Sequence, residues 1–328
     1  MATGRNSLKA ALRRHWMVPG IALACFWGYR YPFAGQWLGD WLGWLIALLM
    51  FLMGTGLGYR SFRARLGSWK QIAFVQALSF LAAPLIAAAL GRLLLEGRPL
   101  AYTGLMLAGT TSTTLGTCVI FTRLAGGDEA LALVLSIFSS LLSVVVSPLL
   151  LLLFLGTALE VPVTLMIHRL SLVLFLPLCC GMLLRTRLGE ERVAQAGPLI
   201  SRGCTVIILA VIMVAMAEGR ELLAGPGSAA VILAAVSLHL AMLLIALLIT
   251  PLTGFSRGDR IAILFCATEK TVQLPAYLAI QILHTPAAAL APVLHHVFQL
   301  VVDSLLVSYY SSKRTAGTPL ALRAEPLD

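Results

Sequence analysis

The chain has 328 residues, of which 59% are hydrophobic and only 12% are charged, and its mean hydropathy is +0.92. A soluble domain carries about 25% charged residues, so this composition excludes a soluble domain and indicates a polytopic membrane protein. The net charge of +10 does not indicate a nucleic-acid partner, because the basic residues are spread over short connections and do not form one face or tail.

Ten apolar segments follow one another along the chain, and a bilayer-spanning helix needs about 20 residues. They are residues 16–31, 41–59, 71–95, 100–122, 129–156, 161–184, 199–217, 228–254, 261–283 and 288–311. The connections between them are short. The sequence therefore predicts a single all-α membrane domain over residues 1–328, with a tail at residues 312–328.

The placement of the basic residues indicates the orientation of these spans. With the N-terminus inside, most of the 24 Lys and Arg residues fall in inside segments. Only Arg30, Arg92, Arg98 and Arg220 fall in outside segments. Such an inside excess of basic residues predicts a multi-pass protein of a plasma or bacterial inner membrane, with both termini and the tail in the cytoplasm.

The second segment ends in Gly54-Thr55-Gly56-Leu57-Gly58, where small residues allow a neighbouring helix to approach closely. A phosphate-binding loop is the alternative, but no strand precedes these glycines and no Lys-Ser follows them. We therefore expect a helix-packing site here.

A dense run of hydroxyl residues interrupts the fourth segment at residues 109–118. A few Ser or Thr side chains can bond back to carbonyls of their own helix, but a run this dense would cover every face of a helix. We therefore expect an unwound segment that lines a cavity. Its candidate binding residues are Ser112, Thr113, Thr114, Thr117, Cys118 and Thr122.

The third and fifth segments also contain polar residues, and those of the fifth segment have two interpretations. Ser79 lies within the third segment, and Ser136 begins a stripe of serines on the fifth that is as typical of helix packing as of a wet face. Asp128 and Glu129 open the fifth segment, where the positive end of a helix favours acids, so they either cap the helix or take part in transport.

The ninth segment contains a charge pair, Glu269-Lys270, flanked by Thr271, Gln273 and Pro275. Each ionisable residue at bilayer depth costs roughly 2.5 to 3.5 kcal/mol, so such residues normally face a protein-lined cavity and are candidates for function. The proline favours a kink or an unwound turn at the same place. The tenth segment carries His295, His296, Gln299 and Asp303. We expect no metal site there, because adjacent histidines point about 100° apart on a helix.

The two interrupted segments occupy corresponding positions in two halves of five spans, residues 16–156 and 161–311. Because five is odd, the second half enters the membrane with the opposite orientation. Paired interruptions in inverted repeats are typical of secondary transporters, whose binding sites lie between the broken helices.

Three stretches resemble a known family. Residues 112–133 resemble the fourth-span signature of the bile acid:sodium symporter superfamily. Residues 265–271, Phe-Cys-Ala-Thr-Glu-Lys-Thr, resemble the ninth-span motif of its cotransporter-7-like branch, and residues 296–299 are similar to that branch's tenth span. The resemblance implies a panel of helices 1, 2, 6 and 7, and a core of helices 3–5 and 8–10 in which helices four and nine are broken and cross.

The resemblance also implies ion sites, since sodium-coupled relatives bind two ions beside the crossing. By position, their ligands map to Ser79, Cys118, Val119, Ala132, Ser136, Phe265 and Glu269. Val119, Ala132 and Phe265 have no side-chain oxygen that could bind an ion. Lys270 adds a charge, and two like charges about 4 Å apart repel by about 4 kcal/mol at an effective dielectric constant near 20. Our hypothesis is that the Lys270 ammonium replaces one ion and is balanced by Glu269; the alternative is a static salt bridge that holds the crossing together.

Together these features predict a secondary active transporter of a small organic anion, coupled to sodium or protons. The expected binding residues are those named in segments three to five, with Glu269, Lys270, Thr271, Gln273 and Gln299. The expected partners are that anion and the lipid bilayer, with no nucleic acid, no cofactor and no metal beyond a possible sodium ion; the oligomeric state stays open. The alternative is a non-transporting membrane regulator of ion homeostasis. We do not expect an enzyme, because no nucleophile–base or metal spacing is present.

Overall fold

The computed structural model describes residues 17–57 and 59–316, which are helical and contain no strand. The predicted cytoplasmic N-terminal segment, residues 1–15, and residues 317–328 of the predicted tail lie outside this description.

In chain order, the helices are α2 (Met17–Arg30), α3 (Pro32–Asp40), α4 (Leu42–Gly56), α5 (Tyr59–Arg65), α6 (Trp69–Ala77), η1 (Leu78–Ala82), α7 (Ala83–Leu94), α8 (Pro99–Thr110), α9 (Thr117–Leu124), α10 (Glu129–Leu155), α11 (Val163–Leu170), η2 (Ser171–Phe175), α12 (Leu176–Leu188), α13 (Glu190–Glu218), α14 (Arg220–Ala224), α15 (Ser228–Ile249), η3 (Thr250–Thr253), α16 (Arg257–Thr268), α17 (Gln273–Tyr277), η4 (Leu278–Ile282), η5 (Pro286–Ala289) and α18 (Leu290–Ala316).

Among the described residues, six helices are long and apolar enough to cross a membrane. A seventh span results if α3 and α4, which are bent by 70° at Trp41, count as one. The fourth and ninth predicted segments are not among them, because each consists of two short helices separated by a break. The sequence analysis did not predict α3. This helix begins at Pro32, and proline fits the first turn of a helix.

The two breaks interrupt helices at the predicted places. α8 ends at Thr110, and Thr111 is extended, with φ −91° and ψ 167°. α16 ends at Thr268, and Glu269 is extended, with φ −74° and ψ 136°. Pro275 lies within the first turn of α17, where its missing N–H has no helical partner to lose.

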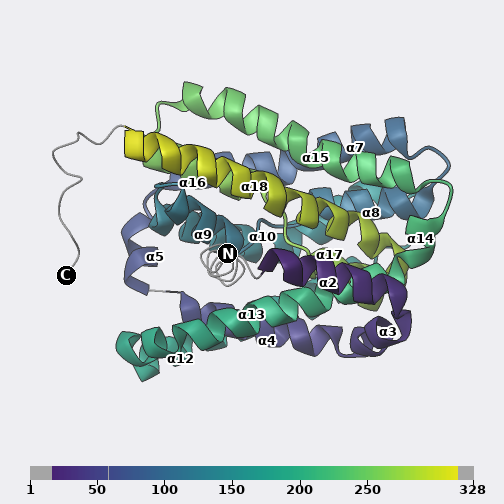
Figure 1. Cartoon of the computed structure of the whole chain (residues 1–328), viewed down its shortest axis with the longest axis horizontal. Helices are drawn as coiled ribbons and strands as arrows, with labels where there is room; N and C mark the ends of the chain where they lie inside the picture. The colour runs from purple at the N-terminus through teal and green to yellow at the C-terminus, as the bar shows by residue number, and fades with distance from the viewer. Residues whose placement is uncertain (1–16, 58, 317–328) are drawn as a thin grey trace, which may run out of the picture.

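The helices pack in two groups that lie along opposite sides of the molecule (Figure 1). In one group α4 packs against α12 and α13, and α13 also packs against α2 and α3. In the other, α15 packs against α7, α16 and α18, while α16 packs against α9 and α10. Both breaks belong to the second group.

Close packing between α4 and α12 depends on glycine. A Cβ atom added at Gly181 would collide with the backbone oxygen of Phe51, and one added at Gly54 would collide with that of Leu178. The structure therefore supports the helix-packing interpretation at Gly54.

Gly181→Ala is expected to destabilise the protein, because a helix backbone must shift to admit the methyl group, and overpacking typically costs about 1–3 kcal/mol. The melting temperature of the detergent-purified protein should fall. Gly56→Ala is the matched control on α4, since its added Cβ has no atom within 4 Å. Equal melting temperatures for the two variants would contradict this packing role.

Candidate site at the two helix breaks

The two breaks are joined directly by a backbone hydrogen bond. The Thr271 N–H in the second break donates to the Ser112 carbonyl in the first at 3.0 Å. Residues almost 160 positions apart, roughly half the chain, therefore meet at one point. Unwound backbone inside a membrane needs such partners, because no lipid group can satisfy its N–H and C=O groups.

Lys270 is buried at this point, with only 1% of its surface exposed. Its ammonium donates to the carbonyl oxygens of Ser79, at 2.8 Å, and Thr111, at 3.0 Å. The same nitrogen lies 5.8 Å from the centre of the Phe80 ring, within the range of a cation–π contact. The ammonium is thus held by neutral oxygens and a ring face, much as a bound alkali cation would be.

Gln299 of α18 replaces the helical hydrogen bonds that Lys270 loses at the break. Its Oε1 accepts from the Lys270 N–H at 2.8 Å, and its Nε2 donates to the Lys270 carbonyl at 3.0 Å. His296 Nδ1 lies 3.1 Å from that carbonyl oxygen. One amide side chain therefore fixes both polar groups of the Lys270 backbone.

Glu269 is fully buried, and its side chain binds hydroxyl groups of the first break and the start of α9. Its Oε2 accepts hydrogen bonds from the hydroxyls of Thr114, at 2.5 Å, and Thr117, while Oε1 has no hydrogen-bond partner among the described residues. No ion pair within 4 Å joins Glu269 to Lys270 in the described part of the chain. The static salt bridge, the alternative interpretation of Glu269 and Lys270, is therefore not formed, because extended backbone sends successive side chains to opposite sides.

Four of the seven implied ion ligands have no side-chain oxygen: Cys118 has a thiol, and Val119, Ala132 and Phe265 are apolar. Cys118 Sγ donates to the Thr114 carbonyl at 2.6 Å and lies 3.0 Å from Ser136 Oγ. Phe265 contacts the ring of Phe121, with 5.9 Å between ring centroids. Hard cations prefer oxygen ligands, so two sodium sites do not fit these residues. The oxygens of Glu269, Thr114 and Thr117 fit at most one.

A small polar cavity of about 20 Å³ lies against both breaks. That volume is about the space for one water molecule. Ser112, Thr113, Thr271 and Gln273 line it from the breaks, and the Thr271 hydroxyl donates to Gln273 Oε1. Leu115 and Leu274 also line it, and α4, α10 and η2 contribute Met50, Met53, Ser140, Ser143 and Leu174.

A larger cavity of about 380 Å³ separates the two groups of helices. Leu52 and Met53 of α4 line one side and Gly116 and Val119 line the other, and residues of α13 also line it. Its walls are mostly apolar, and Arg185 is the cation among its lining residues. Met53 and Leu115 line both this cavity and the small polar one, so the two spaces adjoin.

Most of the predicted site residues are thus connected through hydrogen bonds or the small cavity. Thr122 is set apart: it is buried on α9, and its hydroxyl has no hydrogen-bond partner among the described residues. The sequence did not select Ser139, which accepts from the Thr113 N–H at 3.1 Å, or Ser143, which lines the small cavity. The spacing of the serines on α10 was the signal available for them.

Asp128 caps α10 and also forms an ion pair. Its carboxylate accepts from the Leu131 N–H at 2.8 Å and pairs with Arg65 of α5. Arg65 also contacts Asp259 at 3.1 Å, so one guanidinium joins the starts of α10 and α16. Hydrogen bonding to Asp128 raises the pKa of the Arg65 guanidinium above its ordinary value. These contacts favour the capping interpretation of Asp128.

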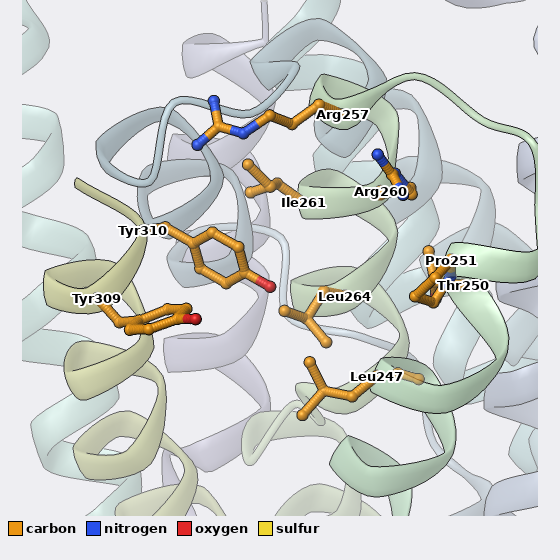
Figure 2. A pocket seen from close by; sticks show the side chains of 10 residues that line it. Leu247, Thr250, Pro251, Arg257, Arg260, Ile261, Leu264, Tyr309 and Tyr310 are labelled. Atoms are coloured by element: carbon orange, nitrogen blue, oxygen red, sulfur yellow. The ribbon is translucent and has the colours of Figure 1, made fainter. Parts of the chain in front are cut away.

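A further cavity, of about 330 Å³, lies where α15 and α18 end and α16 begins (Figure 2). Arg257 and Arg260 line it, and Figure 2 shows the hydroxyls of Tyr309 and Tyr310 pointing into the same space. Neither arginine takes part in an ion pair within the described residues. The cavity is separate from the breaks.

Long apolar helices, two interrupted segments and buried charges at their meeting point define an α-helical multi-pass membrane protein of the transporter class. The model of the SBF-like CPA transporter family matches residues 15–312, and the chain belongs to this family. Sodium/bile acid cotransporter 7 from Danio rerio is 26% identical over 95% of this chain and 99% of its own length. The Rattus norvegicus protein of the same name is 29% identical, over 62% of this chain and 63% of its own. Uncharacterized protein PA2026 from Pseudomonas aeruginosa is 30% identical over 82% and 84%.

Proposed function

We propose that the protein is a secondary active transporter of a small organic anion. One observation carries this proposal: two helix breaks from distant parts of the chain bind each other around a buried lysine and a buried glutamate. Such an arrangement costs a membrane protein stability, and it is typical of the binding sites of secondary transporters.

The two groups of helices fit a moving core against a fixed panel. In this proposal the ten predicted segments form two inverted repeats; the panel comprises α2, α4, α11 to α12 and α13, and the core comprises the remaining spans. The cargo binds in the 380 Å³ cavity between them, with its polar end toward the small cavity at the breaks. Both termini lie in the cytoplasm, by the distribution of basic residues.

The anionic preference rests on charge and wall chemistry. Lys270 and Arg185 are positive, and α9 begins at Thr117, where the positive end of its dipole faces the cavity side. The remaining walls are apolar, which suits an amphipathic carboxylate or sulfonate. The names of the vertebrate relatives point to the same chemical class.

The oxygen atoms available at the helix breaks limit which ion can be coupled to transport. The Lys270 ammonium takes the place of one cation, and Glu269 with Thr114 and Thr117 leaves a single position for sodium. Coupling therefore uses a proton or one sodium ion, not two.

Counterflow in proteoliposomes tests the proposal. Liposomes with purified protein are loaded with one unlabelled organic anion from a panel that includes bile acids, and uptake of the labelled form is measured. We expect saturable uptake above protein-free liposomes for at least one anion. Saturable binding to detergent-purified protein without uptake by any liposome would favour the regulator and contradict transport.

A further inference from the structure

A second group of buried titratable side chains lies between α15 and α18. His239 of α15 and Asp303 of α18 are each 0% exposed, and His239 Nε2 lies 3.6 Å from Asp303 Oδ1. His295 packs its ring edge against His239, with 5.5 Å between ring centroids. Both residues of the pair lie near the middle of membrane-length helices, Ser228–Thr253 and Pro286–Ser312.

The pair is poorly satisfied by hydrogen bonds. Within the described residues, neither oxygen of Asp303 and neither ring nitrogen of His239 has a hydrogen-bond partner. Each buried polar atom left unpaired costs about 1–3 kcal/mol, and native proteins hold few of them. The pair therefore reduces stability, which is typical of groups that serve a function inside a membrane protein.

The net charge of the His239–Asp303 pair depends on how many protons it binds. With one proton between them, His239 and Asp303 have no net charge, whether as imidazole and carboxylic acid or as imidazolium and carboxylate. Without that proton the pair carries one negative charge, and with a second proton it carries one positive charge. An isolated net charge at this depth is costly, so gain or loss of the proton changes the energy of the whole core.

The other groups that face the pair connect it with the breaks. On α18 these are His295, whose Nδ1 lies 3.1 Å from the Ala235 carbonyl, and His296, which contacts the Lys270 carbonyl. From the second break, Glu269 interacts electrostatically with Asp303, and Lys270 interacts with His295. α16 also carries the buried Cys266. The neighbouring helices carry titratable groups that are at least partly exposed: Arg92, Tyr102, Arg123, Glu218, Arg220 and Glu221.

We propose that His239 and Asp303 form a proton-binding site that is coupled to movement of the core. The site takes one proton from water on one side of the membrane and releases it on the other, without any change to a covalent bond of the cargo. Because Glu269 interacts electrostatically with Asp303, release of the proton from the pair changes the electrostatic field at the helix breaks. This inference rests on the proposed transport function and names its coupling ion.

Infrared difference spectra between acidic and alkaline pH test proton binding without any cargo. The full chain, reconstituted in phosphatidylcholine vesicles, should show a carbonyl-stretching band of a protonated carboxyl group that Asp303→Asn lacks. Glu160→Gln, at an exposed position, is the matched control and should keep the band. His239→Gln leaves the carboxyl group in place but removes its proton partner, so the titration midpoint should move by about one pH unit, or tenfold in proton affinity.

An unchanged band in Asp303→Asn, or an unchanged midpoint in His239→Gln, would overturn the proton site. The counterflow assay separates this failure from failure of the transport proposal. Uptake by the wild type with the same pH dependence in Asp303→Asn would overturn the proton site alone. A band that depends on Asp303 in a protein without uptake of any anion would leave the proton site standing and overturn its coupling to transport.

Discussion

Lys270→Ala is expected to lower anion uptake at least about a hundredfold and to give the protein a larger sodium response than that of the wild type. The alanine leaves the carbonyl oxygens of Ser79 and Thr111 without the ammonium that they bind at 2.8 and 3.0 Å. It also leaves Glu269 as a buried charge with no cation nearby. A sodium ion restores both the oxygen contacts and the neutral charge balance, so it should bind the variant.

Lys270→Met provides the matched control, because methionine removes the charge but fills the space that an ion would need. This variant should also lose uptake, yet its sodium response should not exceed that of the wild type. Normal uptake by Lys270→Ala would contradict the role of the lysine.

Gln299→Leu is expected to destabilise the protein more than any single hydroxyl replacement at the breaks. The leucine is close in size but leaves the Lys270 N–H without an acceptor and removes one donor from its carbonyl. The unsatisfied N–H costs about 1–3 kcal/mol, and the hydrogen bond lost at the carbonyl, which His296 still contacts, costs about 0.5–1.5 kcal/mol more. Uptake should fall as well, because the second break loses its anchor to α18.

Thermal unfolding of the detergent-purified protein measures the effect. Gln299→Glu keeps the acceptor for the Lys270 N–H and loses the donor to the carbonyl, so its melting temperature should lie below that of the wild type. Ser304→Ala on α18 is the control, since its hydroxyl bonds only to the Leu300 carbonyl of its own helix. Wild-type stability in Gln299→Leu would show that Gln299 does not hold the break.

The positions of the breaks were predictable because the residues there oppose a membrane helix locally. Four Thr and one Ser at residues 110–114, and the proline at residue 275, act on their own segments. α3 was not predicted, because its aromatic and glycine residues are equally typical of a connection at the membrane surface. Its helical form depends on packing against α13, which is a tertiary contact.

The partners of the buried charges were harder to predict. A static salt bridge was one interpretation of Glu269 and Lys270, but the extended backbone between them directs the two side chains to different partners. The contact between His239 and Asp303 joins α15 to α18, and the two residues are 64 positions apart in the sequence. Neither residue belongs to a recognisable sequence motif. Such pairs depend on how helices pack, so single-sequence periodicity cannot identify them.

The most direct test of the central claim, that the Lys270 ammonium occupies a cation position at the crossing, is a sodium titration of thermal stability. Purified wild type, Lys270→Ala and Lys270→Met are melted in sodium chloride and in choline chloride at equal ionic strength. A ligand at 100 times its Kd stabilises the folded state by about 2.7 kcal/mol. We expect a larger saturable, sodium-specific increment in Lys270→Ala than in the other two proteins. The same sodium response in all three proteins would contradict the claim.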